Sequence, residues 1–388
     1  MKKMNLLFGV AAALVLLSAC SAGPSGAVGD KIDENEIKIG ANLELSGAVA
    51  AYGSAEKEGA TLAVEEINKA GGIDGKKIKW IEKDNKSDNA EVASVASNLT
   101  VNSKVVAIVG PATSGAVKAS TPNVTKASVP LVTPSGTDDS LTVQNGKVQP
   151  YVFRSCFQDS FQGVVLAKYA SENLKVDKAV ILGDNSSDYA VGISKAFKKA
   201  YKGEIVSEQN FVAGDKDFQA QLTKIKNQTF DVLVVPGYYA EAGLIIKQAR
   251  DLGITQPILG ADGFGDEKLV ETAGEKNVSN VYYTGAFSTK APATDKVEGF
   301  VKAFKEKYGK EPSAFNALGY DAVYMIKQAT EDKKAKTSKD IADGLAELKD
   351  FVGVTGEMTV DKNHNPEKSA VVIGLTDGKE SSADTVNP

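Results

Sequence analysis

The stretch VVAIVGPATSGAVKAS, residues 105–120, contains the pattern that indicates the fold most directly. Five apolar residues, 105–109, end at Gly110 and predict a short buried strand. A loop of small and hydroxyl-bearing residues follows, and helical spacing begins after it. A helix that starts from such a loop presents free backbone N–H groups, which can bind an anion. On these residues alone, the loop could hold a phosphate, a substrate under nucleophilic attack or another anion.

Strands and helices alternate along the rest of the chain. Apolar runs predict strands at 37–43, 78–81, 105–109, 130–133, 179–182, 231–235, 257–260 and 281–284. Helical spacing predicts helices between them, further helices near 295–308, 313–330 and 338–348, and a β-like tail at 351–375. The alternation indicates parallel sheets covered on both faces. Because it occurs as two series in a chain of 388 residues, we predict two doubly wound α/β lobes with a ligand cleft between them.

The N-terminus has the features of a targeting segment. Lys2 and Lys3 precede the apolar run LLFGVAAALVLL, which is too short and too early for a stable membrane span. We predict a signal peptide over residues 1–19, and the run LSAC, which ends at Cys20, resembles a bacterial lipobox in which the cysteine is lipidated. The alternative is cleavage near Ala19 with Cys20 incidental. Under the lipobox prediction, residues 20–36 are a lipidated cysteine followed by a flexible tether.

Composition excludes several classes of function. A net charge of −5 disfavours nucleic acid as a partner, and only two arginines, Arg154 and Arg250, are present to recognise phosphate. The single histidine, His364, is expected to be an exposed loop residue, so a nucleophile–histidine pair and a histidine-based metal site have no support. Cys156 is expected to be a small buried core residue. No Walker loop or dinucleotide motif is present, and we predict no enzymatic activity, no metal and no cofactor.

Polar residues at the predicted strand ends form the remaining candidate site. Hydroxyl groups gather on one lobe at Ser114, Thr133, Ser135 and Thr137, an anion site of modest charge that suits one carboxylate better than a phosphate. Asp262 follows a strand of the other lobe, where it could receive a cation. Four tyrosines on strand-end loops could wall an apolar pocket: Tyr52, Tyr189, Tyr238 and Tyr239. The alternatives are helix caps and turns for the hydroxyls, a solvated loop for the aspartate and core packing for the tyrosines.

Several runs, in this order and spacing, resemble a known family. They are AYGSAEKEGATLAVEEINKAGGIDGKKI (51–78), VGPATSGA (109–116), VTPSGT (132–137), GDKDF (214–218), PGYYAEAG (236–243) and GADGFG (260–265). The sequence resembles the solute-binding lipoproteins of bacterial ABC importers, and within them the branched-chain (Leu/Ile/Val) amino-acid-binding group. The resemblance covers about residue 37 to the C-terminus. A disulfide found in some members has no counterpart here.

The resemblance implies a type I periplasmic-binding fold, in which two lobes joined by a hinge close on the ligand. It divides the chain into 37–155 plus 286–369 for lobe 1, and 156–285 plus 370–388 for lobe 2. It assigns Ser114, Ser135 and Thr137 to the ligand carboxylate and Asp262 to the ligand ammonium. It also places three tyrosines in the pocket wall: Tyr52, Tyr189 and Tyr238. Family members often have Glu where Asp262 stands, and the shorter Asp requires a closer approach or a bridging water.

These features predict an extracytoplasmic protein, anchored to the outer face of the cell membrane through Cys20, that captures a branched-chain amino acid. It would deliver the ligand to an ABC permease and ATPase complex, and it is expected to be a monomer. Two alternatives stay open. The fold could bind another amino acid, an amide, a urea or an aromatic acid, or the protein could be a surface sensor without transport. A secreted hydrolase lacks a nucleophile–base pair in this sequence.

Overall fold

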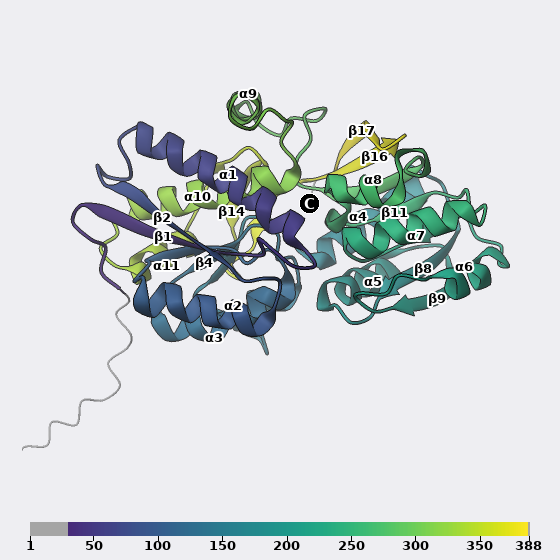
Figure 1. Ribbon diagram of the computed structural model, residues 1–388, viewed down its shortest axis with the longest axis horizontal. Coiled ribbons are helices and arrows are strands. Elements are labelled where there is room, and N and C mark those ends of the chain that lie inside the picture. The colour runs from purple at the N-terminus through teal and green to yellow at the C-terminus, as the bar shows by residue number, and fades with distance from the viewer. Residues whose placement is uncertain (1–29, 387–388) are drawn as a thin grey trace, which may run out of the picture.

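The computed structural model describes residues 30–386, which form two α/β lobes lying side by side (Figure 1). The sheet of the first lobe has the order β2 (Lys77–Asp84), β1 (Glu36–Leu43), β3 (Ala107–Val109), β4 (Leu131–Thr133) and β7 (Val152–Arg154). The sheet of the second lobe has the order β17 (Lys379–Val386), β16 (Ala370–Thr376), β12 (Val281–Gly285), β11 (Ile258–Gly260), β10 (Val232–Val234), β8 (Lys178–Asp184) and β9 (Glu204–Phe211). All pairs are parallel except β12 with β16 and β16 with β17. The predicted fold class is confirmed.

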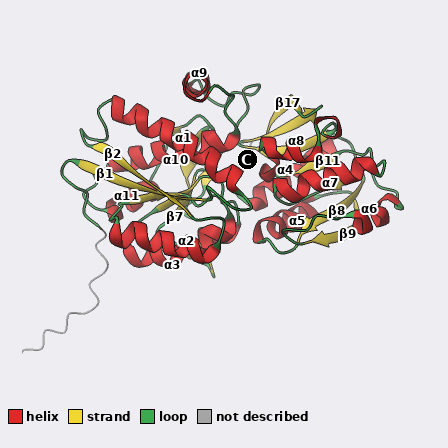
Figure 2. Ribbon diagram, viewed as in Figure 1, coloured by secondary structure: helices red, strands yellow, loops and turns green. Residues whose placement is uncertain are grey.

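Helices cover both faces of the first sheet (Figure 2). One face packs against α1 (Ala50–Lys69), α10 (Ala314–Lys333) and α11 (Ser338–Ala346), and the other against α2 (Asn89–Ser97) and α3 (Ser114–Ala127). Strand β3 shows how the sequence produces these two layers. Ala107 and Val109 lie in the core beneath α1 and α10, whereas Ile108 lies in the core beneath α2 and α3. Alternate side chains of a strand point to opposite faces, so an unbroken apolar run serves both layers.

The second lobe repeats this arrangement. Helices α6 (Gln219–Lys226), α7 (Tyr239–Asp251) and α8 (Glu267–Ala273) cover one face of its sheet, and α4 (Asp159–Glu172) and α5 (Asp188–Ala200) cover the other. Val180 and Leu182 of β8 face the first group, while Ala179 and Ile181 face the second. Both sheets are therefore buried on their two sides, which leaves the strand ends as the places where loops can form a site.

The remaining elements are short or peripheral. They are β5 (Val143–Gln144), β6 (Lys147–Val148), β13 (Phe351–Val352), β14 (Glu357–Val360), β15 (Pro366–Glu367), the helix α9 (Lys296–Tyr308), the π-helix η1 (Asn98–Asn102) and the 3-10 helices η2 (Asp139–Leu141), η3 (Asp262–Phe264) and η4 (Glu275–Asn277). The chain crosses between the lobes after β7, after β12 and between β15 and β16. No helix among residues 30–386 combines the length and apolarity needed to cross a membrane.

Several elements depart from the sequence prediction. Strands β7 and β9, helices α4 and α8, and the hairpin β5–β6 lay outside the predicted set. Strand β9 has the sequence EIVSEQNF and lies at the edge of its sheet, so its exposed face carries charged and polar residues and no apolar run appears. In α4, the apolar run VVLA includes Val164, which is exposed, and this blurs the helical spacing.

His364 corrects a second prediction, because it is buried rather than exposed. Its ring stacks on Phe153 with 4.2 Å between ring centroids, and its Nδ1 lies 3.1 Å from the carbonyl oxygen of Val152. Burial lowers the pKa of the imidazole. Cys156 is buried with a free thiol, as predicted.

The predicted signal peptide and Cys20 lie outside the described residues. The end of the predicted tether, from residue 30, is bonded to the first lobe. The N–H of Asp30 donates to Ser338 Oγ (2.9 Å), and the N–H of Ile32 donates to the carbonyl of Lys336 (2.9 Å).

Candidate functional site

A small cavity lies between the two lobes, at the carboxyl ends of their strands. Its volume is about 10 Å³, enough for roughly one water molecule, so the lobes lie close together over it. The first lobe contributes Tyr52, Ala112, Thr113, Ser114, Ser135 and Phe315, and the second contributes Tyr189, Tyr238, Asp262 and Gly263. Ligands of open α/β sheets bind at this position. The cavity is therefore the candidate ligand site.

The loop after β3 brings Ser114 to the cavity. Thr113 is the N-cap of α3 and Ser114 is its first residue, so the positive end of the helix faces the cavity wall. Ser114 is buried, and its Oγ accepts a hydrogen bond from the N–H of Asp138 (3.1 Å). A hydroxyl that accepts still has its own hydrogen to donate. Ser114 can therefore donate to a ligand carboxylate.

Glu44, which the sequence analysis did not single out, already occupies part of the predicted anion site. Its carboxylate accepts from the N–H groups of Ala112 (3.0 Å) and Thr113 (3.1 Å) and from the Thr113 hydroxyl (3.0 Å). Complete burial raises the pKa of Glu44, although these hydrogen bonds oppose the rise. The signal in the sequence is its position directly after β1, at the carboxyl end of a strand. Glu44 leaves fewer N–H groups free than the sequence suggested.

The loop after β4 brings Ser135, but not Thr137, to the cavity lining. Ser135 Oγ lies 3.0 Å from the carbonyl oxygen of Ala112 and also contacts Oε1 of Glu56. The hydroxyl of Thr137 is fully buried and has no hydrogen-bond partner among residues 30–386. It lies near the carboxyl of Asp159, whose pKa burial raises well above the usual range. Thr137 therefore does not line the cavity in this structure.

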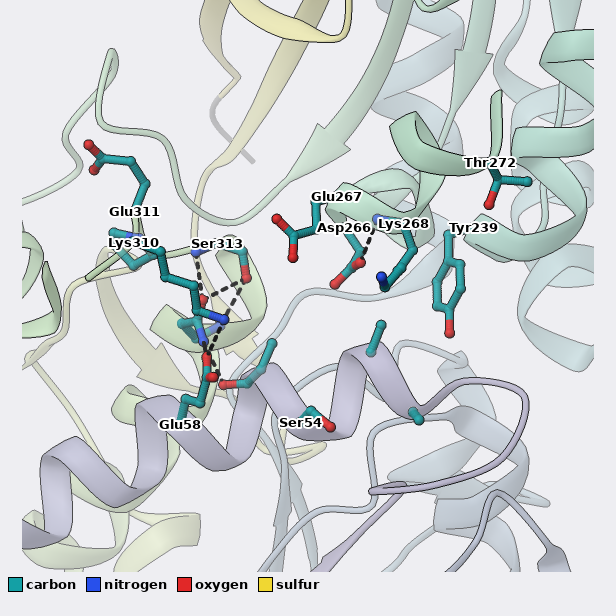
Figure 3. A pocket seen from close by; sticks show the side chains of 15 residues that line it. Ser54, Glu58, Tyr239, Asp266, Glu267, Lys268, Thr272, Lys310, Glu311 and Ser313 are labelled. Carbon is teal, nitrogen blue, oxygen red and sulfur yellow. Dashed lines mark hydrogen bonds and ion pairs between the residues drawn. The ribbon is translucent and has the colours of Figure 1, made fainter. Parts of the chain in front are cut away.

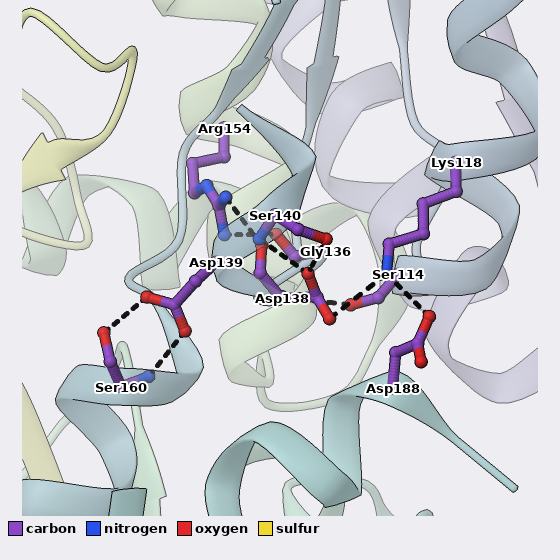
Figure 4. Close-up of polar contacts among 9 residues, drawn as sticks. All are labelled: Ser114, Lys118, Gly136, Asp138, Asp139, Ser140, Arg154, Ser160 and Asp188. Atoms are coloured by element: carbon purple, nitrogen blue, oxygen red, sulfur yellow. Dashed lines mark hydrogen bonds and ion pairs between the residues drawn. The ribbon is translucent and has the colours of Figure 1, made fainter. Parts of the chain in front are cut away.

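Arg154 holds this loop in place (Figure 4). Its guanidinium donates to the carbonyl of Gly136 (3.0 Å) and to the carbonyl of Asp138 (2.9 Å) from a fully buried position. Sequence spacing did not indicate this role, because Arg154 lies on β7, a strand that was not predicted. The arginine thus supports the hydroxyl loop from behind, and it does not line the cavity.

Asp262 faces these hydroxyls from the second lobe. Its Oδ1 accepts from the Tyr189 hydroxyl (2.7 Å) and from Nε2 of Gln162 (3.0 Å), and its own N–H donates to Oε1 of Gln162 (3.0 Å). The side chain is 9% exposed, and desolvation raises its pKa to about 6. At neutral pH the carboxylate is mainly ionised. It is a buried negative charge that a ligand cation can neutralise.

The tyrosines form an aromatic wall that spans both lobes. Tyr189 and Tyr238 stack at 5.0 Å with an interplanar angle of 8°, and Tyr52 meets Tyr238 edge-on at 5.7 Å. The Tyr52 hydroxyl donates to the carbonyl of Gly263 (2.6 Å) and accepts from the N–H of Tyr239 (3.1 Å). Tyr52 belongs to α1 of the first lobe, and both partners belong to the second. These bonds therefore hold the lobes in a closed arrangement.

An ion-pair cluster closes the rim beside Ser114 (Figure 4). Lys118 Nζ, on α3 of the first lobe, lies 2.6 Å from Asp188 Oδ2 at the start of α5 in the second lobe, and 3.3 Å from Asp138 Oδ2. Nearby, the N–H of Ser160 on α4 donates to Oδ2 of Asp139 (3.0 Å). The Lys118–Asp188 and Ser160–Asp139 contacts cross from lobe to lobe.

A wider groove lies on the outside of the same interface (Figure 3). Its volume is about 550 Å³, and its lining includes Glu58, Tyr239, Asp266, Lys268 and Lys310. Its polar groups are largely paired within the protein. Asp266 caps α8 through the N–H of Lys268 (2.9 Å), and Glu58 pairs with Lys310 (3.0 Å). The smaller cavity, which brings Asp262 opposite the hydroxyl loops, remains the better candidate.

The structure thus brings six of the seven predicted ligand-site residues to one cavity. Ser114, Ser135, Asp262, Tyr52, Tyr189 and Tyr238 line it, and Thr137 lies beyond its lining. Glu44, Glu56, Gln162 and Phe315 belong to the same neighbourhood and were missed. The binding roles of the predicted residues stay predictions.

Comparisons with known proteins agree with the two-lobe fold. The family model for periplasmic binding proteins matches residues 36–380. A Leu/Ile/Val-binding protein homolog 3 of Brucella melitensis is 32% identical over 317 residues, 80% of this chain and 84% of its own. The branched-chain amino acid transporter substrate binding protein LivJ from Streptococcus pneumoniae, solved with isoleucine, is 52% identical, with a TM-score of 0.88 over 91% of this chain and 100% of its own. The leucine binding protein LivK from Thermotoga maritima is 33% identical, with a TM-score of 0.84 over 91% of this chain and 99% of its own.

Proposed function

The chain belongs to the periplasmic binding protein family, and on that premise we propose that it captures a branched-chain amino acid for an ABC importer. The family resemblance predicted from the sequence is confirmed. Family members are binding proteins rather than enzymes, and they act outside the cytoplasm. The likeness to LivJ with isoleucine supports an aliphatic amino acid as the ligand class.

One observation carries the proposal: Asp262 and the start of α3 lie on opposite sides of one interlobe cavity. A buried carboxylate on one side and hydroxyl and N–H donors on the other fit the two charges of a free amino acid. We assign the ligand ammonium to Asp262 and the ligand carboxylate to Ser114, Ser135 and Thr137. Among these, Ser114 has the clearest free donor.

The ligand side chain would contact the aromatic wall of Tyr52, Tyr189 and Tyr238. Its burial contributes about 1.5–3 kcal/mol for an aliphatic group of leucine size. Together with charge-assisted hydrogen bonds of about 1.5–3 kcal/mol each, this supports a dissociation constant near micromolar after the cost of ordering and closure. The lobes would close over the ligand through the bonds of Tyr52 and the Lys118–Asp188 pair.

Titration calorimetry of residues 21–388 with leucine, isoleucine and valine tests the ligand class. The expected result is saturable binding of at least one of the three. Heat with a dipeptide, a sugar, an amide or an aromatic acid, and none with the three amino acids, would refute the assignment. A carboxylate at position 262 already disfavours ligands without an amino group, since the buried charge would then lack a partner.

Anchoring and partners are further parts of the proposal. We propose that Cys20 carries lipid, that the protein acts as a monomer, and that it delivers its ligand to a permease and ATPase complex. Incorporation of labelled palmitate into the wild type, and its loss in Cys20→Ala, tests the anchor. Light scattering tests the monomer, and leucine uptake into cells with and without the gene tests the transport role.

A further inference from the structure

Glu56 is a buried carboxyl group directly behind the cavity, and the proposed binding scheme does not use it. It lies on α1 one helical turn after Tyr52, so both side chains point to the same side of the helix. Glu56 is 0% exposed and contacts Ser135, which lines the cavity. No lysine, arginine or histidine among residues 30–386 forms an ion pair with it. A buried ionised carboxylate without such a partner is costly.

The hydrogens around Ser135 indicate the protonation state of Glu56. Ser135 Oγ has one hydrogen but two oxygen neighbours, the carbonyl oxygen of Ala112 at 3.0 Å and Oε1 of Glu56. A carbonyl oxygen can only accept. Because one hydrogen cannot make two full hydrogen bonds, both contacts are fully satisfied when Ser135 donates to Ala112 and Glu56 donates to Ser135. That arrangement requires a proton on Glu56.

The surroundings of Glu56 also favour its protonated form. Burial raises the pKa of Glu56 well above the usual range, and the charges of Glu44, after β1, and Asp262, from the second lobe, raise it further. The third titratable neighbour is the Cys156 thiol, after β7, whose own pKa is raised to about 12. The other oxygen of Glu56, Oε2, is buried without a hydrogen-bond partner among residues 30–386. An unpaired oxygen is tolerated more easily on a neutral acid than on an anion.

We propose that Glu56 is a positioning residue of the binding site and is held as a neutral carboxylic acid. It donates a hydrogen bond to Ser135, and this bond fixes the Ser135 hydroxyl against the carbonyl of Ala112. This inference rests on the proposed function for its effect on ligand affinity, but not for the protonation itself. In this arrangement the Ser135 hydroxyl hydrogen is already used, so Ser135 serves a ligand through its main chain and its placement. Asp262 is then the ionised carboxylate that faces the ligand cation.

Infrared spectroscopy tests the protonation without a ligand. The carbonyl stretching band of a protonated carboxyl group is expected in the wild type at pH 7, and it should be smaller in Glu56→Gln by one group. Glu65→Gln, an exposed position on the same helix, is the control and should leave the band unchanged. An identical band in wild type and Glu56→Gln overturns the proposal.

Binding of leucine, isoleucine and valine tests the positioning role. Gln can donate to Ser135 as a neutral acid does, so Glu56→Gln should keep the dissociation constant within about threefold, whereas Glu56→Ala should weaken it about tenfold or more. Equal affinity of both variants, or equal loss in both, overturns the positioning role. If the wild type binds none of the three, the proposed ligand class fails. The melting temperatures then decide the role of Glu56. Glu56→Gln should melt with the wild type, and Glu56→Ala should melt at a lower temperature. Equal melting temperatures of the wild type and both variants overturn the positioning role.

Discussion

Replacement of Asp262 by Asn should weaken ligand binding and stabilise the empty protein at the same time. Asn keeps the size of the side chain and an acceptor oxygen for Tyr189 and Gln162, which now bond to Oδ1. Only the charge is removed. If Asp262 holds the ligand ammonium, the variant leaves that cation without a charged partner in a buried site, and affinity must fall.

The structure gives the size of both effects. Loss of one partner of a buried charge pair costs about 2–4 kcal/mol, which weakens binding about 30- to 1000-fold. Stability changes in the other direction, because desolvation raises the pKa of Asp262 from 3.8 to about 6. The ionised form therefore costs the empty protein about 3 kcal/mol at neutral pH, and Asn removes much of that cost.

Calorimetry with leucine, isoleucine and valine measures the first effect, and thermal or urea unfolding of the ligand-free protein measures the second. Asp251→Asn, an exposed position on α7, is the matched control and should change neither quantity. Affinity within threefold of wild type would place the ammonium contact elsewhere. A variant that is less stable than wild type would mean that Asp262 serves the fold rather than the ligand.

Three further perturbations test the closure and the charge of the site. Ligand affinity should fall as pH drops below about 6, because Asp262 gains a proton. The same titration should raise the stability of the empty protein as pH falls from about 6 toward 3.8. Calorimetry checks the change in affinity, and unfolding across this pH range checks the change in stability. Tyr52→Phe removes the bonds to Gly263 and Tyr239, so dissociation in stopped-flow fluorescence should accelerate about 5- to 30-fold while the ligand-free melting temperature changes little. Asp188→Asn should weaken binding by only about two- to fivefold, because the pair with Lys118 is partly exposed, and high salt should abolish the difference from wild type.

The layers of the fold were predictable because each buried strand is a short apolar run between amphipathic helices. Residues 105–109 and 179–182 show this, and both lie in the predicted sheets. Edge strand β9 was not predictable in the same way, since its exposed face carries charge. His364 was misjudged because its local sequence is turn-like, while the stacking on Phe153 that buries it comes from a residue far away in the chain.

The position of loops at the ends of predicted strands located the candidate site, but it did not predict the hydrogen bonds within the site. Ser114, Asp262 and the tyrosines could be named because each follows a predicted strand. The partners of Ser135 could not, because Glu56 comes from the second turn of a helix and Ala112 contributes a backbone oxygen. Sequence position indicates which loops meet, whereas the direction of each hydrogen bond depends on side chains that approach from other elements.

Four buried carboxyl groups lie around the cavity, Glu44, Glu56, Asp159 and Asp262, and of these only Asp262 lines it. Glu44 accepts three hydrogen bonds from the loop before α3, so its charge is already satisfied and it braces that loop. Glu56 is neutral and donates to Ser135. Asp262 accepts its two side-chain hydrogen bonds at one oxygen and lines the cavity. The site can therefore be rich in acidic residues and still accept a ligand that carries its own carboxylate, because a single uncompensated charge faces that ligand. A second ionised carboxylate at Glu56 would oppose the ligand carboxylate, which is why its proton matters for binding a zwitterion.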